Sequence, residues 1–126
     1  MSFDWTEYHS LAQELAGQPV SPRPAEQEAR LRAAISRAYY AVFCRARNHL
    51  RDKERRTIPR KDIHKYVREE FRSRPDQLRQ QIGHDLNRLH IDRCKADYED
   101  TVGKVVQMAQ MDLLLAGEVL ASLESL

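Results

Sequence analysis

The fold is decided by a stretch in the first half of the chain, LRAAISRAYYAVFCRARNHL (residues 31–50). Apolar residues recur in it at steps of three and four, which is the period of one face of an α-helix. The stretch therefore predicts a long core helix, beginning near Ala25 and ending at about Leu50. Its inward row is Leu31, Ala34, Ile35, Ala38, Val42, Ala46 and Leu50.

Other segments carry the same period on both sides of this helix. A first helix is expected from near Asp4 to Ala16, followed by a linker that contains Pro19 and Pro22. Further helices are expected over about 61–72, from Asp76 onward, and from around 98–101 to the C-terminus. The last helix carries two apolar rows, so we expect it to be buried centrally or shared with a second subunit.

Length and composition agree with a single helical domain. A chain of 126 residues has the size of one domain. Its 4 Gly and 5 Pro leave few tight turns for a multi-stranded sheet, and helix formers fill the rest. We therefore predict an all-α, up-and-down bundle of four to five helices that spans residues 1–126.

The sequence contains no sign of export or of a cofactor. The N-terminal stretch MSFDWTEYHS is not followed by an apolar run, and no segment approaches the roughly 20 apolar residues of a membrane span. Cys44 and Cys94 are too few for a disulfide framework or a structural zinc site. His90 and Cys94 have helical spacing, but two ligands on one helix are a weak metal signal. We expect a cytoplasmic protein without metal or cofactor.

One arginine interrupts the apolar row of the predicted fourth helix. Leu78, Ile82, Leu86 and Leu89 are followed at the next step by Arg93. A buried guanidinium needs a carboxylate, a cleft or a ligand, and Asp97 follows one turn later. Arg93 is therefore either half of a structural ion pair or the floor of a functional cleft, and its position in the sequence leaves both interpretations open.

Positive charge is concentrated between residues 45 and 61. Eight Lys or Arg stand there against Asp52 and Glu54, a net charge of +6, although the whole chain carries only +2. Such a patch is suited to phosphate backbones, and a solvated helix end is the alternative. Immediately before it, Arg37, Tyr40 and Cys44 form a row separate from the core row, which is explained equally by aromatic packing.

Two short motifs resemble the small stand-alone HEPN-domain proteins of prokaryotes. They are SRAYYAVF (residues 36–43) in the long helix and RCKADY (residues 93–98) before the last helix. His64 and the opening Asp4-Trp5 pair fall in matching order. The resemblance covers nearly the whole chain.

This resemblance implies a homodimer with a cleft between its two copies. Many members are metal-independent ribonucleases, often toxins paired with a small nucleotidyltransferase antitoxin. Their activity depends on an arginine followed four to six residues later by histidine, and this chain has Tyr98 at the place that corresponds to the histidine. Arg79 and His84 have the motif's spacing, but they lie too early in the predicted helix to match it.

The candidate site follows from this correspondence. Arg93 is expected to clamp phosphate, Asp97 and Tyr98 to orient it, and His90 to be the best available base. His64 and His84 are the other histidines that could face Arg93, and the sequence does not decide among them. The residues expected to bind RNA or phosphate are Arg37, Tyr40, Arg45, Arg47, Arg51, Arg55 and Arg56.

Two functions remain open at this stage. The first is a dimeric module that binds RNA, nucleotide phosphate or a nucleotidyltransferase-like partner without catalysis. The second is a metal-independent ribonuclease that cleaves single-stranded RNA, in which Tyr98 is a poor substitute for histidine because an unperturbed tyrosine has a pKa of about 10.

Overall fold

Five α-helices make up the described part of the chain, which is residues 3–17 and 24–126 of a computed structural model. They are α1 (Thr6–Gly17), α2 (Pro24–Asp52), α3 (Ile63–Arg72), α4 (Gln77–Tyr98) and α5 (Val105–Ser125). The described residues contain no strand, so the predicted all-α helical bundle is confirmed. Pro19 and Pro22 of the predicted linker lie outside the described residues.

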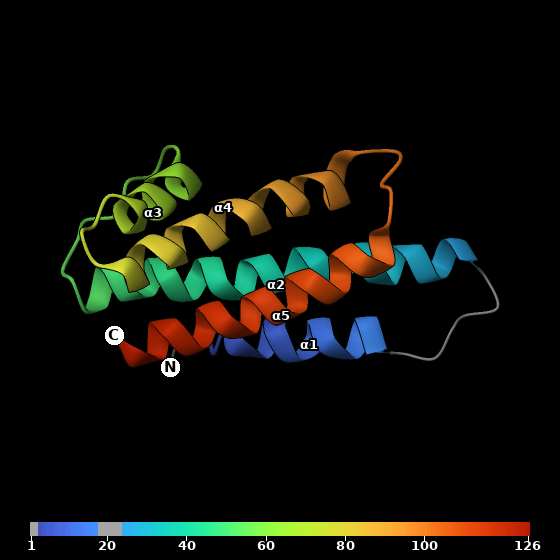
Figure 1. The fold of residues 1–126 in the computed structure, drawn as a ribbon, viewed down its shortest axis with the longest axis horizontal. Helices are drawn as coiled ribbons and strands as arrows, with labels where there is room; N and C mark the ends of the chain where they lie inside the picture. Colours follow the sequence, from blue (N-terminus) through green and yellow to red (C-terminus); the bar gives the residue numbers. More distant parts are fainter. Residues whose placement is uncertain (1–2, 18–23) are drawn as a thin grey trace.

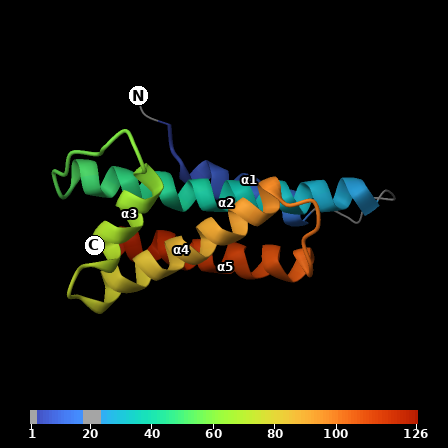
Figure 2. The same cartoon turned by 90° about the horizontal axis from the view of Figure 1, so that it is seen from above.

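The four long helices, α1, α2, α4 and α5, run alternately up and down. Figure 1 shows α2 along the middle of the molecule, with α1 and α5 on one side of it and α4 on the other. The short helix α3 lies over the first half of α4, as the view from above in Figure 2 also shows. Helix α2 contacts each of the other four helices, so it is the central element.

The predicted core row of α2 is confirmed in full. Its seven residues, from Leu31 to Leu50, are all buried. On α3, Val67 and Phe71 of the predicted row are likewise fully buried. Two predicted helix starts also agree with the structure, because Asp4 and Asp76 accept hydrogen bonds from the first turns of α1 and α4.

The predicted boundary between the last two helices is wrong. Helix α4 continues to Tyr98, and α5 begins only at Val105. One reason is an arginine of α2: Arg32 donates to the carbonyl oxygens of Ala96 and Glu99 at 3.1 and 2.6 Å. These bonds satisfy acceptors that a helix end leaves free and hold the loop after α4 against α2.

The inward face of α5 agrees with the two predicted apolar rows at Ala109, Ala116, Val119 and Leu123, and it differs from them at Asp112. Its buried residues are Ala109, Asp112, Ala116, Val119 and Leu123, so a carboxylate occupies the middle of the row. Val106, which was expected to face the core, is exposed. On α4, Leu78 of the predicted core row is exposed as well.

Helix α5 is long and apolar enough to cross a membrane by length and composition alone. The core helix of a bundle passes the same test, and the buried residues of α5 pack against α1, α2 and α4. We therefore describe α5 as a bundle helix, and the cytoplasmic location stays a prediction.

Candidate phosphate-binding site

Arg93 lies in the second-last turn of α4 rather than near the start of the last helix. Its Nε atom is 2.8 Å from Oδ2 of Asp97, and the hydroxyl of Ser36 on α2 donates to the same carboxylate oxygen at 3.2 Å. The predicted ion pair therefore exists, and it also joins α4 to α2.

Two tyrosine rings flank the Arg93 guanidinium. Its Cζ atom is 5.0 Å from the ring centre of Tyr40 and 5.5 Å from that of Tyr98, which is within the range of cation–π attraction. The Arg93 side chain is only 14% exposed, whereas Tyr98 is 72% exposed. The guanidinium is thus mostly buried, and the exposed ring of Tyr98 lies beside it.

The surroundings of Arg93 keep it charged. Burial alone disfavours the cation, but the nearby Tyr40, Asp97 and Tyr98 outweigh burial and raise the pKa of Arg93. Oδ2 of Asp97 lies closest to Nε, and among the described residues the two terminal nitrogens of Arg93 donate no hydrogen bond. These two nitrogens are the part of the side chain that an anion would meet.

A second group of aromatic and imidazole rings lies beneath this surface. The Tyr39 hydroxyl is 2.6 Å from Nδ1 of His64, and the His64 ring stacks on Phe43 with ring centres 4.2 Å apart. The ring of His90 is 5.4 Å from that of His64. Helices α2, α3 and α4 each contribute to this group.

The surroundings of these two histidines lower the pKa of both. Burial first, and then the positive charges of His90, Arg93 and Arg68, lower the pKa of His64 to about 4. Burial first, and then Arg68 and Arg93, lower the pKa of His90. The structure therefore places two histidines near Arg93, and the lowered pKa of each makes it a weaker base than a free imidazole.

No metal site accompanies the predicted His90 and Cys94 pair. The Cys94 sulfur lies 3.7 Å from Nε2 of His90, but the described residues contain no group of three or more His, Cys, Asp or Glu suited to a metal ion.

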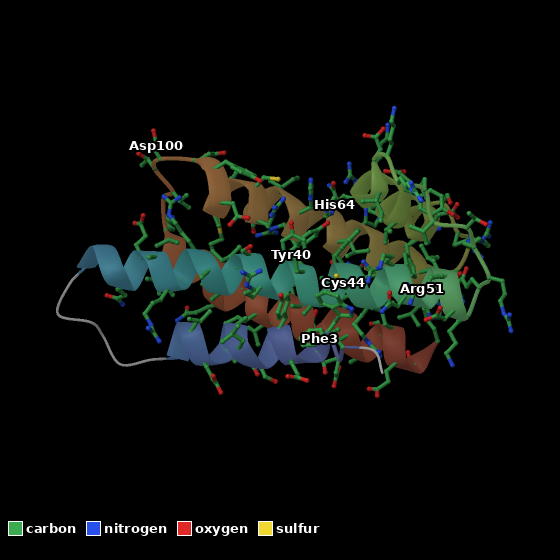
Figure 3. The ribbon with its side chains drawn as sticks, turned by 180° about the vertical axis from the view of Figure 1, so that it is seen from behind. Phe3, Tyr40, Cys44, Arg51, His64 and Asp100 are labelled. Carbon is green, nitrogen blue, oxygen red and sulfur yellow. The ribbon has the colours of Figure 1, made fainter. Side chains whose placement is uncertain are left out.

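Part of the predicted phosphate-binding set lies along one face of α2. Positions 37, 40, 44, 47 and 51 are spaced by three and four residues, and Figure 3 shows Tyr40, Cys44 and Arg51 along this face. The Arg37 guanidinium lies over the Tyr8 ring of α1, and that of Arg47 lies over Trp5. We call Arg37, Tyr40, Arg47 and Arg51, together with Arg93 and Tyr98, the α2–α4 face.

The other predicted basic residues do not join this face. Arg45 lines a separate hollow with the C-terminal end of α5, while Arg55 and Arg56 are exposed in the loop after α2. Within the same basic segment, Glu54 forms ion pairs with Arg74 and Arg79. Arg79 therefore has a structural ion-pair partner in Glu54.

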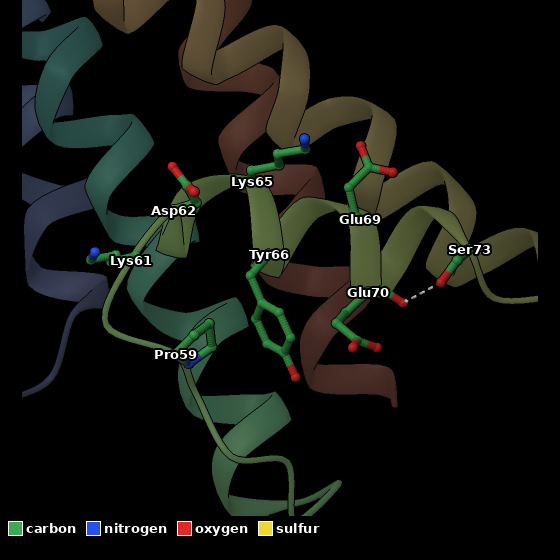
Figure 4. A pocket seen from close by; sticks show the side chains of 8 residues that line it. All are labelled: Pro59, Lys61, Asp62, Lys65, Tyr66, Glu69, Glu70 and Ser73. Carbon is green, nitrogen blue, oxygen red and sulfur yellow. Dashed lines mark hydrogen bonds between the residues drawn. The ribbon is translucent and has the colours of Figure 1, made fainter.

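Another surface pocket lies on the outer side of α3. It is lined by basic and acidic side chains in near balance, and the hydroxyl of Ser73 donates to the carbonyl oxygen of Glu70 at 3.4 Å (Figure 4). None of the predicted site residues lines it. Because it lacks an excess of positive charge, we do not assign phosphate binding to this pocket.

Sequence reasoning missed the contact between Tyr39 and His64 and the buried Asp112. A tyrosine at an inward position was a usable signal for the first, because a buried hydroxyl needs a partner. No local signal marked Asp112, because the predicted rows of α5 contained only apolar residues.

No protein-family model matches the chain, and no curated protein or solved structure matches it. The likeness to HEPN-domain proteins therefore depends on the sequence motifs alone, chiefly those at residues 36–43 and 93–98.

Proposed function

We propose that this chain binds single-stranded RNA through the α2–α4 face and does not cleave it. The observation that carries the proposal is the position of Arg93. Its Nε lies at ion-pair distance from Asp97 without forming a hydrogen bond, and its outer nitrogens donate to no described residue. A guanidinium fixed in this way is oriented to receive two oxygens of one phosphate group.

The aromatic residues beside Arg93 support RNA rather than an isolated phosphate ion. Single-stranded RNA is usually held by stacking its bases on aromatic rings and by contacts with its backbone. Tyr98 offers an open ring beside the guanidinium. Arg37 and Arg47 continue the positive charge along α2, whereas the Arg51 guanidinium is paired with Asp52 through two hydrogen bonds.

The neutral histidines argue against cleavage. Metal-free cleavage of RNA requires a group that removes the 2′-hydroxyl proton and a group that protonates the leaving oxygen. His64, with a pKa of about 4, remains unprotonated at neutral pH and is a weak base. His90 is shifted in the same direction, and the position that matches the family's histidine is Tyr98.

Fluorescence anisotropy with a labelled, mixed-sequence single-stranded RNA tests the proposal. We expect Arg93→Ala to weaken binding by about tenfold or more, since a charge-assisted bidentate contact is lost. Tyr98→Ala should weaken it by about fivefold or more, through lost stacking. Arg72→Ala is the matched control, because it removes one positive charge from α3 outside the face, and it should change affinity by less than about twofold.

Two results would contradict the proposal. Equal losses for Arg93→Ala and Arg72→Ala would mean that binding depends on net charge and not on this face. RNA with 2′,3′-cyclic phosphate ends, formed in the presence of a chelator by the wild type and not by Arg93→Ala, would establish the ribonuclease instead.

A further inference from the structure

Two aspartates are buried together between α4 and α5, on a different side of the bundle from the α2–α4 face. Asp92 of α4 is 6% exposed and Asp112 of α5 is 1% exposed. Neither carboxylate oxygen of Asp112 has a hydrogen-bond partner among the described residues. Buried carboxylates are ordinarily paired or hydrogen-bonded, so this arrangement calls for a physical explanation.

The chain itself supplies little compensation for these carboxylates. The nearest cation is Arg88, whose Nε lies 3.8 Å from Oδ2 of Asp92, at the limit of an ion pair. The Arg88 side chain is largely exposed, so water screens much of its charge. Among the described residues, the pair therefore has no desolvated cation beside it.

The two aspartates line two adjoining hollows between the helices. Asp112 lines one hollow and Asp92 the other, and Arg88 and Met111 line both. We call the two hollows together the α4–α5 groove. Its rim is apolar and exposed: Met111 is 55% and Leu114 69% exposed, and Ile91 is exposed as well.

The charge of this groove is negative. Its acidic lining residues are Asp85, Asp92, Asp112 and Glu118, and its basic ones are Arg88 and Lys95. With all of these groups ionised, four negative and two positive charges leave a net charge of −2. Exposed apolar side chains around a buried negative charge are complementary to a cation that is itself surrounded by apolar groups.

We propose that the α4–α5 groove binds a partner polypeptide by taking up one arginine or lysine side chain that lies among apolar residues. The cationic head lies against Asp92 and close to the buried carboxyl of Asp112, and the flanking apolar side chains cover Met111 and Leu114. Such a contact places a cation beside the two aspartates and covers the exposed side chains of Met111 and Leu114.

A second copy of this chain is a poorer occupant. Two identical surfaces meet in a symmetric dimer, and here each copy would bring the same excess of negative charge. Like charges placed opposite each other across an interface cost free energy. The occupant is therefore expected to be a different polypeptide with positive charge.

In the unbound chain, a proton bound to Asp112 offsets the buried negative charge instead of this cation. Burial first, and then the neighbouring Asp92, raise the pKa of Asp112 to about 8. The other ionisable groups that line its hollow are His84, Asp85 and Arg88 of α4 and Glu118 of α5. Because the proton and the incoming cation compete for the same carboxylates, binding should tighten as the pH rises toward 8 and above.

The test uses the full chain and the tripeptide acetyl-leucyl-arginyl-leucyl-amide, followed by two-dimensional NMR of the protein amides. We expect shifts confined to α4 and α5, with a dissociation constant in the millimolar range for so small a probe. Asp112→Asn should weaken binding by about tenfold or more. Glu118→Gln, which removes a rim charge from the same groove, should weaken it by less than about threefold.

Three outcomes would overturn the proposal. One is the absence of shifts in α4 and α5, and another is equal binding of the uncharged citrulline peptide. The third is a dimer in sedimentation velocity that Leu114→Glu dissociates, because the occupant would then be a second copy. Asp112→Asn replaces the carboxyl by a group of nearly equal size, so a loss of binding will not reflect unfolding.

Discussion

At Asp112 a single buried side chain couples the stability of the bundle to pH. Its pKa in the folded chain is raised from 3.8 to about 8, so folding favours the protonated form. This contribution to stability is fully present below about pH 4 and is lost as the pH rises through about 8. At neutral pH the burial of this carboxyl therefore lowers the free energy of unfolding.

We predict that Asp112→Asn increases the free energy of unfolding at pH 8 to 9 by about 1–3 kcal/mol, the usual cost of an unsatisfied buried polar group. Urea denaturation of wild type and variant between pH 4 and 9 measures this, and the gap between the two curves should widen with pH. A gap that stays constant over the range would show that Asp112 has an ordinary pKa.

Arg93 was the part of the site that the sequence could predict. A charged residue at an apolar step of a helix requires a partner, and Asp97 one turn later supplied a candidate that the structure contains. The two flanking tyrosine rings could not be inferred so directly, because Tyr40 reaches Arg93 from another helix. Asp112 escaped prediction since the exposed Leu114 and the half-buried Leu113 made the apolar period of α5 ambiguous.

At the scale of helices, α4 packs closely against α3 at Gly83. A Cβ atom there would lie 2.7 Å from the backbone nitrogen of Arg72 and 2.9 Å from the carbonyl oxygen of Arg68. Those are backbone atoms, so the clash is relieved only if the two helices move apart. Gly83 therefore sets the distance between α3 and α4.

We predict that Gly83→Ala lowers the free energy of unfolding by about 1–3 kcal/mol, the usual cost of overpacking. Gly117→Ala on α5 is the matched control. Its Cβ would lie 3.7 Å from the His9 ring, so the better helix propensity of alanine should raise stability by about 0.5–1 kcal/mol. Thermal or urea denaturation of both variants checks this, and the same sign of change in both would contradict it.

The helices themselves differed in how well the sequence predicted them. Helix α2 has an unbroken apolar row, and that row alone determined its inward face. The end of α4 depends instead on Arg32, which is 64 residues from Ala96 in the chain. A contact of that kind has no local signature, which is why the boundary before α5 was placed too early.

At the scale of the whole molecule, the bundle presents two surfaces of opposite charge character. The α2–α4 face carries arginines, the half-buried ring of Tyr40 and the exposed ring of Tyr98. Figure 3 shows this face with α5 behind α2. The α4–α5 groove carries buried carboxylates within an apolar rim. A homodimer and a nucleotidyltransferase-like partner stay predictions from the resemblance, and the two surfaces are the places at which such contacts can be sought.

The central claim is that single-stranded RNA lies on the α2–α4 face, and photochemical cross-linking tests it most directly. RNA that contains 5-iodouridine is irradiated on the wild-type chain, and the attached peptides are identified by mass spectrometry. Because this base reacts with aromatic rings on which it stacks, we predict cross-links at Tyr98 and Tyr40 that are lost in Arg93→Ala. Cross-links only at residues outside this face, or an unchanged pattern in Arg93→Ala, would contradict the account.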